Sequence, residues 1–188
     1  LWGIFENQVE LLHGNTLGKL SGKFERKILQ HADAIIVASE EIKKYYSQLG
    51  YESYYIPNAI DLESLSKKEE RLYKNQIIFV GRLSKEKGIL DLLTICEDIP
   101  KETHLIIVGI GPEENNVKDI SEKYANIHYL GYQPHTRAIE LIRGSDILIQ
   151  PSLMEGGMNT TLLEAMACKT AIITTYLKVY GNDVRHLD

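Results

Sequence analysis

The 188-residue sequence contains few cysteines and no long apolar segment. Its two cysteines, Cys96 and Cys168, do not occur in the paired spacing of a zinc site or a disulfide framework, so we expect two free thiols. No stretch approaches the roughly 20 apolar residues of a membrane-spanning helix. Acidic residues outnumber basic ones by 26 to 21, which leaves a net charge of −5 and argues against a nucleic acid as partner.

The sequence also lacks the marks of a secretory leader and of a metal site. It begins at Leu1, and Glu6 and Glu10 interrupt the opening apolar run, so we expect no signal peptide and an internal fragment of a longer protein. Neither Asp-x-Asp nor His-Glu-x-x-His occurs, so we expect no metal cofactor. The six histidines are isolated, and we expect each to be an ordinary surface or core residue. The expected location is the cytoplasm, with the membrane face as an alternative for a full-length protein.

The composition is that of an ordinary globular protein, with a hydrophobic share of 44% and a charged share of 25%. Its first part predicts two helices and two short strands. Residues 17–31 carry apolar side chains at helical spacing, and Ser39 is a typical cap for a second helix that Gly50 ends. We expect strands over residues 34–38 and 54–56.

The stretch from Asp61 to Asn75 is rich in charges of both signs. Such a run is typical of a solvated connector or helix face. We therefore expect a domain boundary in this region, and we predict one domain in residues 1–58 and another in residues 59–188.

From Gln76 onward, short β-branched runs alternate with helical segments. The predicted strands cover residues 77–80, 105–108, 127–130, 147–149 and 171–174, and the predicted helices cover residues 88–97, 113–124, 137–143 and 160–168. Continuous apolar runs indicate strands buried on both faces. This order predicts an α/β fold, a Rossmann-like parallel sheet with right-handed crossovers and helices on both faces.

In such folds, ligands bind beyond the carboxyl ends of the strands. Arg82 directly follows the first of these strands, and Lys87 is expected to open the next helix. A planar guanidinium, a mobile ammonium and a helix N-terminus together suit a phosphate group. The alternative is that both side chains are solvated surface charges.

The segment after the fourth strand, residues 151–161, is polar and contains Glu155, and Glu164 follows one turn into the next helix. The free N–H groups of a helix start suit an anion. Carboxylates accept hydrogen bonds from hydroxyls, so Glu155 and Glu164 suit a sugar and a ribose on either side of that anion. The alternative is that both are helix-end and surface charges.

Several short motifs occur in a fixed order along the chain. They are Ile56–Asp61, Val80–Leu83, Lys87–Gly88, Ile107–Pro112, Leu130–Gly131, Gln150–Gly156 and Leu163–Ala167. Together they resemble the signature of family 4 glycosyltransferases. The resemblance implies the GT-B architecture of two Rossmann-like domains with the active site in the cleft between them. It assigns residues 1–58 to the end of the N-terminal, acceptor-side domain with its linker, and residues 59–188 to a truncated C-terminal, donor-binding domain.

The resemblance also implies roles for single residues. Arg82 and Lys87 match the basic pair that holds the donor diphosphate. Glu164 matches the residue that binds the ribose hydroxyls, and Glu155 the residue that faces the donor sugar. The nucleobase position, the sugar loop and the remaining donor contacts are matched by Gly81, Tyr132, Gln133, Gly156, Gly157, Met158, Asn159, Thr160, Thr161 and Leu162.

The resemblance finally implies an activity. The family transfers a sugar from a nucleoside-diphosphate sugar with retention of configuration and without an obligatory metal. The implied partners are therefore a glycan, lipid or small-molecule acceptor and the missing part of the N-terminal domain. The chain alone is then expected to be incomplete for transfer. Two features depart from the family pattern: eight residues instead of seven separate Glu155 from Glu164, and residues 176–181 replace a glycine-rich stretch.

Two other functions stay open from the sequence. One is a non-catalytic module that binds a nucleotide sugar or a nucleotide. The other is an oxidoreductase with a Rossmann fold, which is disfavoured because Gly109–Gly111 is not followed by the third glycine of a dinucleotide-binding motif.

Overall fold

A computed structural model describes residues 4–178, which form two compact units. The first unit joins the chain up to Asn58 with the loop Met154–Asn159 and the stretch that begins at Tyr176. The second unit comprises Ala59–Leu153 and Thr160–Thr175. The outer ends of the two predicted domains, residues 1–3 and 179–188, lie outside the described residues.

Five parallel strands form the sheet of the second unit. They are β3 (Asn75–Val80), β4 (Thr103–Val108), β5 (Ile127–Gly131), β6 (Ile147–Gln150) and β7 (Ala171–Thr174). Their spatial order is β5-β4-β3-β6-β7, and each neighbouring pair is parallel. The chain thus moves outward from β3 to β5 and then returns to the other side of β3. The predicted parallel sheet is confirmed, and the order reverses between β3 and β6.

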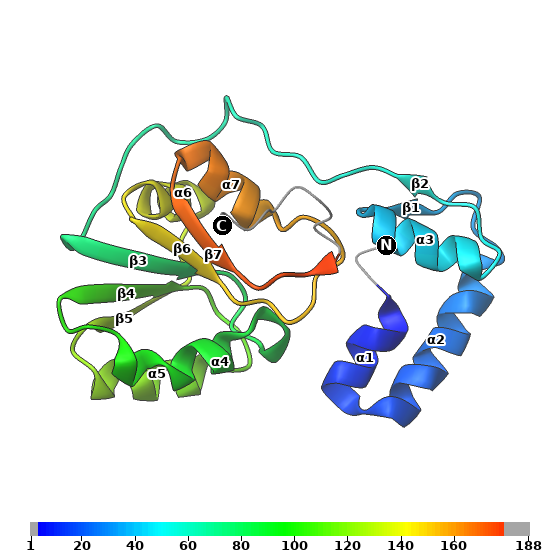
Figure 1. Ribbon diagram of the computed structural model, residues 1–188, viewed down its shortest axis with the longest axis horizontal. Helices are drawn as coiled ribbons and strands as arrows, with labels where there is room; N and C mark the ends of the chain where they lie inside the picture. The colour runs from blue at the N-terminus through cyan, green and yellow to red at the C-terminus, as the bar shows by residue number, and fades with distance from the viewer. Residues whose placement is uncertain (1–3, 179–188) are drawn as a thin grey trace. The chain divides into compact units, whose positions relative to one another are not determined.

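Helices cover both faces of this sheet, as predicted (Figure 1). On one face lie α4 (Ile89–Thr94) and α5 (Glu114–Lys123), and on the other lie α6 (His135–Arg143) and α7 (Thr160–Cys168). Alternate strand residues point to opposite faces. Buried side chains of the strands and of the two helices form one hydrophobic cluster on the face under α4 and α5: Ile77, Phe79, Leu105, Ile107, Ile127, Ile89, Leu92 and Val117.

The helix expected over residues 88–97 is shorter than predicted. Two 3-10 helices, η1 (Lys85–Lys87) and η2 (Cys96–Asp98), flank the six-residue α4. Gly88 ends η1 with a φ of 69°, in the left-handed region that only glycine adopts readily. Lys87 therefore lies in η1, and it does not open α4 as the sequence predicted.

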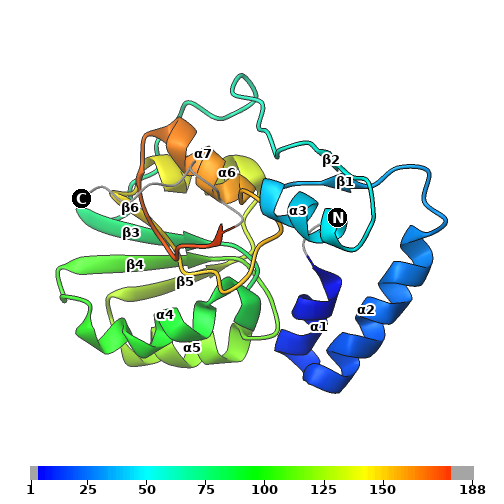
Figure 2. The same cartoon turned by 45° about the vertical axis from the view of Figure 1, so that its right-hand side comes forward.

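The first unit contains three helices and a two-stranded parallel sheet within its described residues. They are α1 (Phe5–His13), α2 (Asn15–Leu29), β1 (Ile36–Val37), α3 (Glu40–Gln48) and β2 (Tyr54–Tyr55). The helices α1 and α2 form an antiparallel hairpin (Figure 2). A Cβ at Gly18 would lie 2.7 Å from that of Glu10, so glycine permits this close approach. The predicted cap is confirmed, since the Ser39 hydroxyl accepts a hydrogen bond from the Ile42 amide at 3.2 Å.

The packed face of α2 differs from its apolar face. Four of the apolar side chains at helical spacing are exposed: Leu17, Leu20, Phe24 and Ile28. The buried face instead contains Gly18, Gly22, Glu25 and Leu29. The Tyr46 hydroxyl donates a 2.8 Å hydrogen bond to Glu25, which gives this buried carboxylate a partner. Burial, and then this carboxylate, raise the pKa of Tyr46.

The charged stretch before β3 is not simply solvated. Glu70 binds the guanidinium of Arg137 in α6 through both carboxylate oxygens, with a shortest distance of 2.8 Å. Arg71 forms a similar pair with Asp146, at 2.7 Å. These pairs attach the connector to the α6 and β6 region of the second unit. Within residues 4–178, no helix is long and apolar enough to cross a membrane.

Candidate functional site

The loops that follow the strands meet at the carboxyl edge of the sheet. Backbone hydrogen bonds of 2.9–3.0 Å join neighbouring loops: Gly81 N to Val108 O, Gly109 N to Gly131 O, Leu83 N to Ile110 O, and Leu153 N to Glu86 O. The loops after β3 and β6 are adjacent where the strand order reverses. Open α/β sheets bind their ligands at such a switch point.

Two glycines permit this close approach of backbones. At Gly88, a Cβ would lie 2.6 Å from the carbonyl carbon of Pro151 and closer still to its oxygen. At Gly109, where φ is 135°, a Cβ would lie 2.9 Å from the carbonyl carbon of Gly81. A Cβ at Gly81 itself would meet nothing nearer than 3.7 Å, so packing within the described residues does not require glycine there.

The two predicted phosphate ligands lie in the loop after β3. Leu83 and Ser84 are buried and anchor this loop, whereas Arg82 is exposed. Among the described residues, the Arg82 side chain forms no hydrogen bond or ion pair, so its guanidinium is available to an anion, while its backbone carbonyl accepts from the Ser84 amide at 3.0 Å. Lys87 is half-buried. The short α4 starts only after Gly88, and its N-terminus adds little to this pair.

Two buried polar atoms lie unpaired where the β3 and β6 loops meet. Within residues 4–178, the Ser84 hydroxyl and Oε1 of Gln150 have no hydrogen-bond partner. Gln150 is fully buried at the end of β6, and Ser84 is 3% exposed. Folded proteins pair nearly all buried polar atoms, and exceptions concentrate at functional sites. A third such atom among residues 4–178, the Ser53 hydroxyl, belongs to the first unit, so within the described part of the second unit these two atoms mark this edge of the sheet.

The helix α7 supplies the predicted ribose ligand. Its first residue Thr160 is exposed, whereas the side chain of Leu162 is fully buried, so Leu162 can serve a ligand only through its backbone. The Glu164 side chain is 13% exposed, and its Oε1 lies 2.8 Å from Nε2 of His135 at the start of α6. This pair was not predicted from the sequence, because its two residues lie 29 positions apart on different helices.

The loop between β5 and α6 contains the two residues predicted near the nucleobase. Tyr132 is 69% exposed, so the faces of its ring are accessible. The Gln133 amide is engaged at both ends: Nε2 donates to the Leu130 carbonyl at 2.6 Å, and Oε1 accepts from Arg137 at 2.7 Å. Gln133 therefore holds the loop in place, and Tyr132 is the side chain of this pair that stays exposed to solvent.

The loop 154–159 groups with the first unit. A Cβ at Gly157 would lie 2.7 Å from that of Ala38, so glycine is needed at this contact. Met158 is buried, and its carbonyl accepts a 2.8 Å hydrogen bond from Nδ2 of Asn58. The predicted sugar loop is thus fixed to the part of the chain that precedes the connector.

Glu155 is half-buried in the same loop. Its Oε1 accepts a 2.9 Å hydrogen bond from Nδ2 of Asn159, which orients the carboxylate. Among residues 4–178, no group of three or more His, Cys, Asp or Glu side chains could hold a metal ion. Independence of the reaction from metal stays a prediction.

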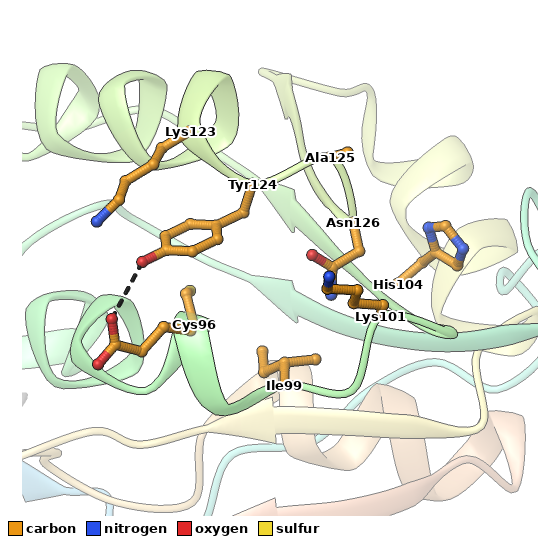
Figure 3. A pocket seen from close by; sticks show the side chains of 9 residues that line it. Cys96, Ile99, Lys101, His104, Lys123, Tyr124, Ala125 and Asn126 are labelled. Carbon is orange, nitrogen blue, oxygen red and sulfur yellow. Dashed lines mark hydrogen bonds between the residues drawn. The ribbon is translucent and has the colours of Figure 1, made fainter.

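A cavity of ≈ 410 Å³ lies at the amino ends of β4 and β5, at the edge of the sheet opposite to the loops described above (Figure 3). It is lined by Cys96, Glu97, Ile99, Lys101, His104, Lys123, Tyr124, Ala125 and Asn126. The Tyr124 hydroxyl donates to Oε2 of Glu97 at 3.3 Å across its mouth (Figure 3). None of the predicted donor ligands lines it.

His104 also belongs to a small ring cluster that the sequence did not predict. Its Nδ1 lies 2.9 Å from Nε2 of His128, and the Tyr73 ring stacks on both imidazoles at 4.1 and 4.3 Å. Burial, and then the neighbouring His104, lower the pKa of His128. The sequence did not indicate these contacts of His104 and His128, nor that of His135 with Glu164, although each is still a surface or core residue as expected.

Comparison with known proteins identifies the family. The family model described as Glycosyl transferases group 1 matches residues 62–186. An uncharacterized glycosyltransferase of Methanocaldococcus jannaschii is 30% identical over 187 residues, which cover 91% of this chain and 46% of that protein. The putative teichuronic acid biosynthesis glycosyltransferase TuaC of Bacillus subtilis is 24% identical, with 87% and 45% covered. The chain spans about half the length of these curated relatives.

Solved structures agree on the fold. S. aureus TarM, in complex with Fondaparinux, alpha-GlcNAc-glycerol and UDP, superposes with a TM-score of 0.70 at 19% identity, covering 87% of this chain and 34% of that one. Sucrose-phosphate synthase from Thermosynechococcus elongatus gives a TM-score of 0.67 at 22% identity, covering 80% and 42%. The family model covers well over half of the chain, and the neighbours share its parallel sheet. The chain therefore belongs to the glycosyl transferases group 1 family and has the GT-B type of fold.

Proposed function

We propose that this chain carries the donor-binding part of a retaining glycosyltransferase, which transfers a sugar from a nucleoside-diphosphate sugar to an acceptor. The observation that carries the proposal is the switch-point edge, where exposed Arg82 after β3 and the loop after β6 share one side of the sheet. The family match supports it, as do the UDP complexes of the structural neighbours TarM and Anabaena HepE.

The proposed chemistry at this edge is electrostatic. A diphosphate leaving group gains negative charge as the glycosidic bond breaks, and fixed cations stabilise that charge without a metal cofactor. Arg82 and Lys87 would supply the cations, and the first N–H groups of α7, from Thr160 to Leu162, would add hydrogen bonds. Gly81 would let the diphosphate approach the backbone between them.

The rest of the donor would be held by groups on either side. Glu164 would accept hydrogen bonds from the ribose hydroxyls, and the exposed Tyr132 ring would stack on the nucleobase. The backbone of Gly156–Met158 would lie along the sugar, and Glu155 would face it. The acceptor would be a glycan, a lipid or another small molecule. Binding of this acceptor would require the part of the acceptor-side domain that residues 1–58 lack, so we expect this chain to bind donor without efficient transfer.

The proposal predicts that the chain binds a nucleoside diphosphate in the presence of EDTA, and that Arg82→Ala weakens this binding. Loss of a charge-assisted hydrogen bond costs about 1.5–3 kcal/mol, or roughly 10- to 150-fold in Kd. Calorimetry with UDP, GDP and ADP measures it, and the free nucleosides should lose much less.

Lys85→Ala is the matched control, because Lys85 is an exposed cation of the same loop with no proposed role. Equal losses for Arg82→Ala and Lys85→Ala would show a general charge effect and contradict the assignment of Arg82. Binding that needs a divalent ion would contradict the metal-free scheme. Absence of binding for all three diphosphates would refute the proposed function.

A further inference from the structure

The contact between His135 and Glu164 is the feature that neither the fold nor the family match accounts for. The imidazole is an exposed side chain, 67% accessible, whereas the carboxylate is only 13% accessible. Among residues 4–178, the one hydrogen bond to Glu164 comes from Nε2 of His135, at 2.8 Å. A mostly buried carboxylate thus depends on an exposed side chain for its partner.

The direction of this hydrogen bond follows from the chemistry of the carboxylate. An ionised carboxylate only accepts hydrogen bonds, so Nε2 of His135 must carry the proton and donate it. The two oxygens of a carboxylate offer about four acceptor positions. The imidazole occupies one of them, which leaves Glu164 with ample capacity for two hydroxyl donors.

The position of His135 gives it no evident role in the fold. It is the first residue of α6, next to Pro134, where the positive end of the helix dipole disfavours a basic residue. The first turn of α6 has no acidic side chain of its own. The imidazole is mostly exposed, and its hydrogen bond is directed at Glu164.

We propose that His135 is a positioning residue for ribose recognition, an inference that rests on the proposed donor-binding function. By donating to Oε1, the imidazole holds the carboxylate of Glu164 in one rotamer. The remaining acceptor positions then face the vicinal hydroxyls of the ribose. Partners of this kind, which orient a ligand-binding group, act on affinity without touching the ligand.

The test compares ribose and 2′-deoxyribose forms of one nucleotide. UDP, GDP and ADP are titrated into the chain by calorimetry, and the tightest of them is then compared with its 2′-deoxy form. His135→Ala should weaken the ribose form about threefold to tenfold, the effect of losing one hydrogen bond, and weaken the 2′-deoxy form by a smaller factor, because that form keeps only the 3′-hydroxyl as a donor to Glu164. His135→Gln should restore most of the loss, because its amide nitrogen can donate from a similar reach.

Thr136→Ala is the matched control, since Thr136 is an exposed neighbour in the same turn. Far-UV circular dichroism checks that each variant folds. If Glu164→Gln abolishes the preference for ribose but His135→Ala behaves like Thr136→Ala, the proposal for His135 is overturned and the donor function stands. If His135→Ala weakens both nucleotide forms equally, His135 does not act through ribose recognition. If the unaltered chain binds no nucleotide, or if Glu164→Gln leaves the ribose preference intact, the assignment of Glu164 fails first.

Discussion

Replacing Gly88 by alanine probes how tightly the loops after β3 and β6 are joined. Gly88 has a φ of 69°, and a Cβ there would lie 2.6 Å from the carbonyl carbon of Pro151. Gly131 is a matched position in the same unit: its φ is 66°, but its Cβ would come no nearer than 3.8 Å to any atom. Both alanines adopt the left-handed conformation, which costs roughly 1–2 kcal/mol.

Only Gly88→Ala adds a collision with backbone. Forcing extra atoms into a packed region costs about 1–3 kcal/mol. We therefore expect Gly88→Ala to lower the free energy of unfolding by about 1–3 kcal/mol more than Gly131→Ala does, a large part of the total of a small domain. Urea denaturation followed by circular dichroism measures both variants against the unaltered chain.

The comparison of Gly88→Ala with Gly131→Ala also separates two explanations for why position 88 requires glycine. If both alanines destabilise the chain equally, the left-handed backbone explains all of the effect, and the close approach of the two loops plays no part. If Gly88→Ala alone also weakens nucleotide binding, the collision disturbs the loop that precedes Gly88 and contains Arg82 and Lys87. No difference in stability between the two variants would refute the steric reasoning.

Two further predictions concern pH. The hydrogen bonds from Arg137, outweighing partial burial, lower the pKa of Glu70, so the pair stabilises the fold above the unfolded pKa of Glu70 and loses its effect as pH falls through the lower folded value. Glu70→Gln should therefore lower the urea midpoint at pH 7, and the difference from the unaltered chain should shrink as the pH falls below the ordinary value of 4.5. His128 is a base with a lowered pKa, so its neutral form is favoured by the fold and stability declines as pH falls below the ordinary value of 6.5. His128→Phe should flatten the pH dependence of the urea midpoint between pH 7.5 and 5.5. If the urea midpoint of the variant changes with pH as steeply as that of the unaltered chain, burial and His104 do not lower the pKa of His128.

The sheet was predictable because its strands are continuous apolar runs. Segments such as Ile77–Val80 and Leu105–Val108 leave no polar position, so only a strand buried on both faces suits them. The spatial order was not predictable, because β6 pairs with β3 through contacts that span 70 positions of the chain. The helix α1 was not among the elements predicted from the sequence. The tight packing of α1 on Gly18 and Gly22 supplies contacts that the periodicity of α1 alone does not indicate.

The packed face of α2 shows where periodicity misleads. Leu17, Leu20 and Phe24 define an apolar stripe, and yet the buried side is the one with two glycines and Glu25. Helical spacing shows which side chains share a face, and it does not show which face meets a neighbour. Backbone proximity and the hydrogen bond from Tyr46 decide the packing here, and neither leaves a signal in hydrophobic spacing.

For the candidate site, the sequence identified the loops and missed the contacts within them. Gln133 was expected near a base, but both ends of its amide bind within the protein. The pairing of Gln133 with Arg137 has a local signal, a spacing of four residues at the start of a helix. The pairing of Arg137 with Glu70 has none, because it depends on the path of the connector over α6.

The distribution of unsatisfied groups gives an independent reason to place the site at this edge. Three buried side-chain oxygens lack a hydrogen-bond partner among residues 4–178, and the one in Ser53 belongs to the first unit. The other two, in Gln150 and Ser84, lie at the carboxyl ends of β6 and β3, and the Glu164 carboxylate has one partner where it could have several. Stability alone would favour apolar residues at such positions, because each unpaired buried polar atom costs about 1–3 kcal/mol. Polar groups at these positions, beside an exposed arginine, are the arrangement expected of a ligand site, where a bound ligand supplies the hydrogen-bond partners that the fold does not.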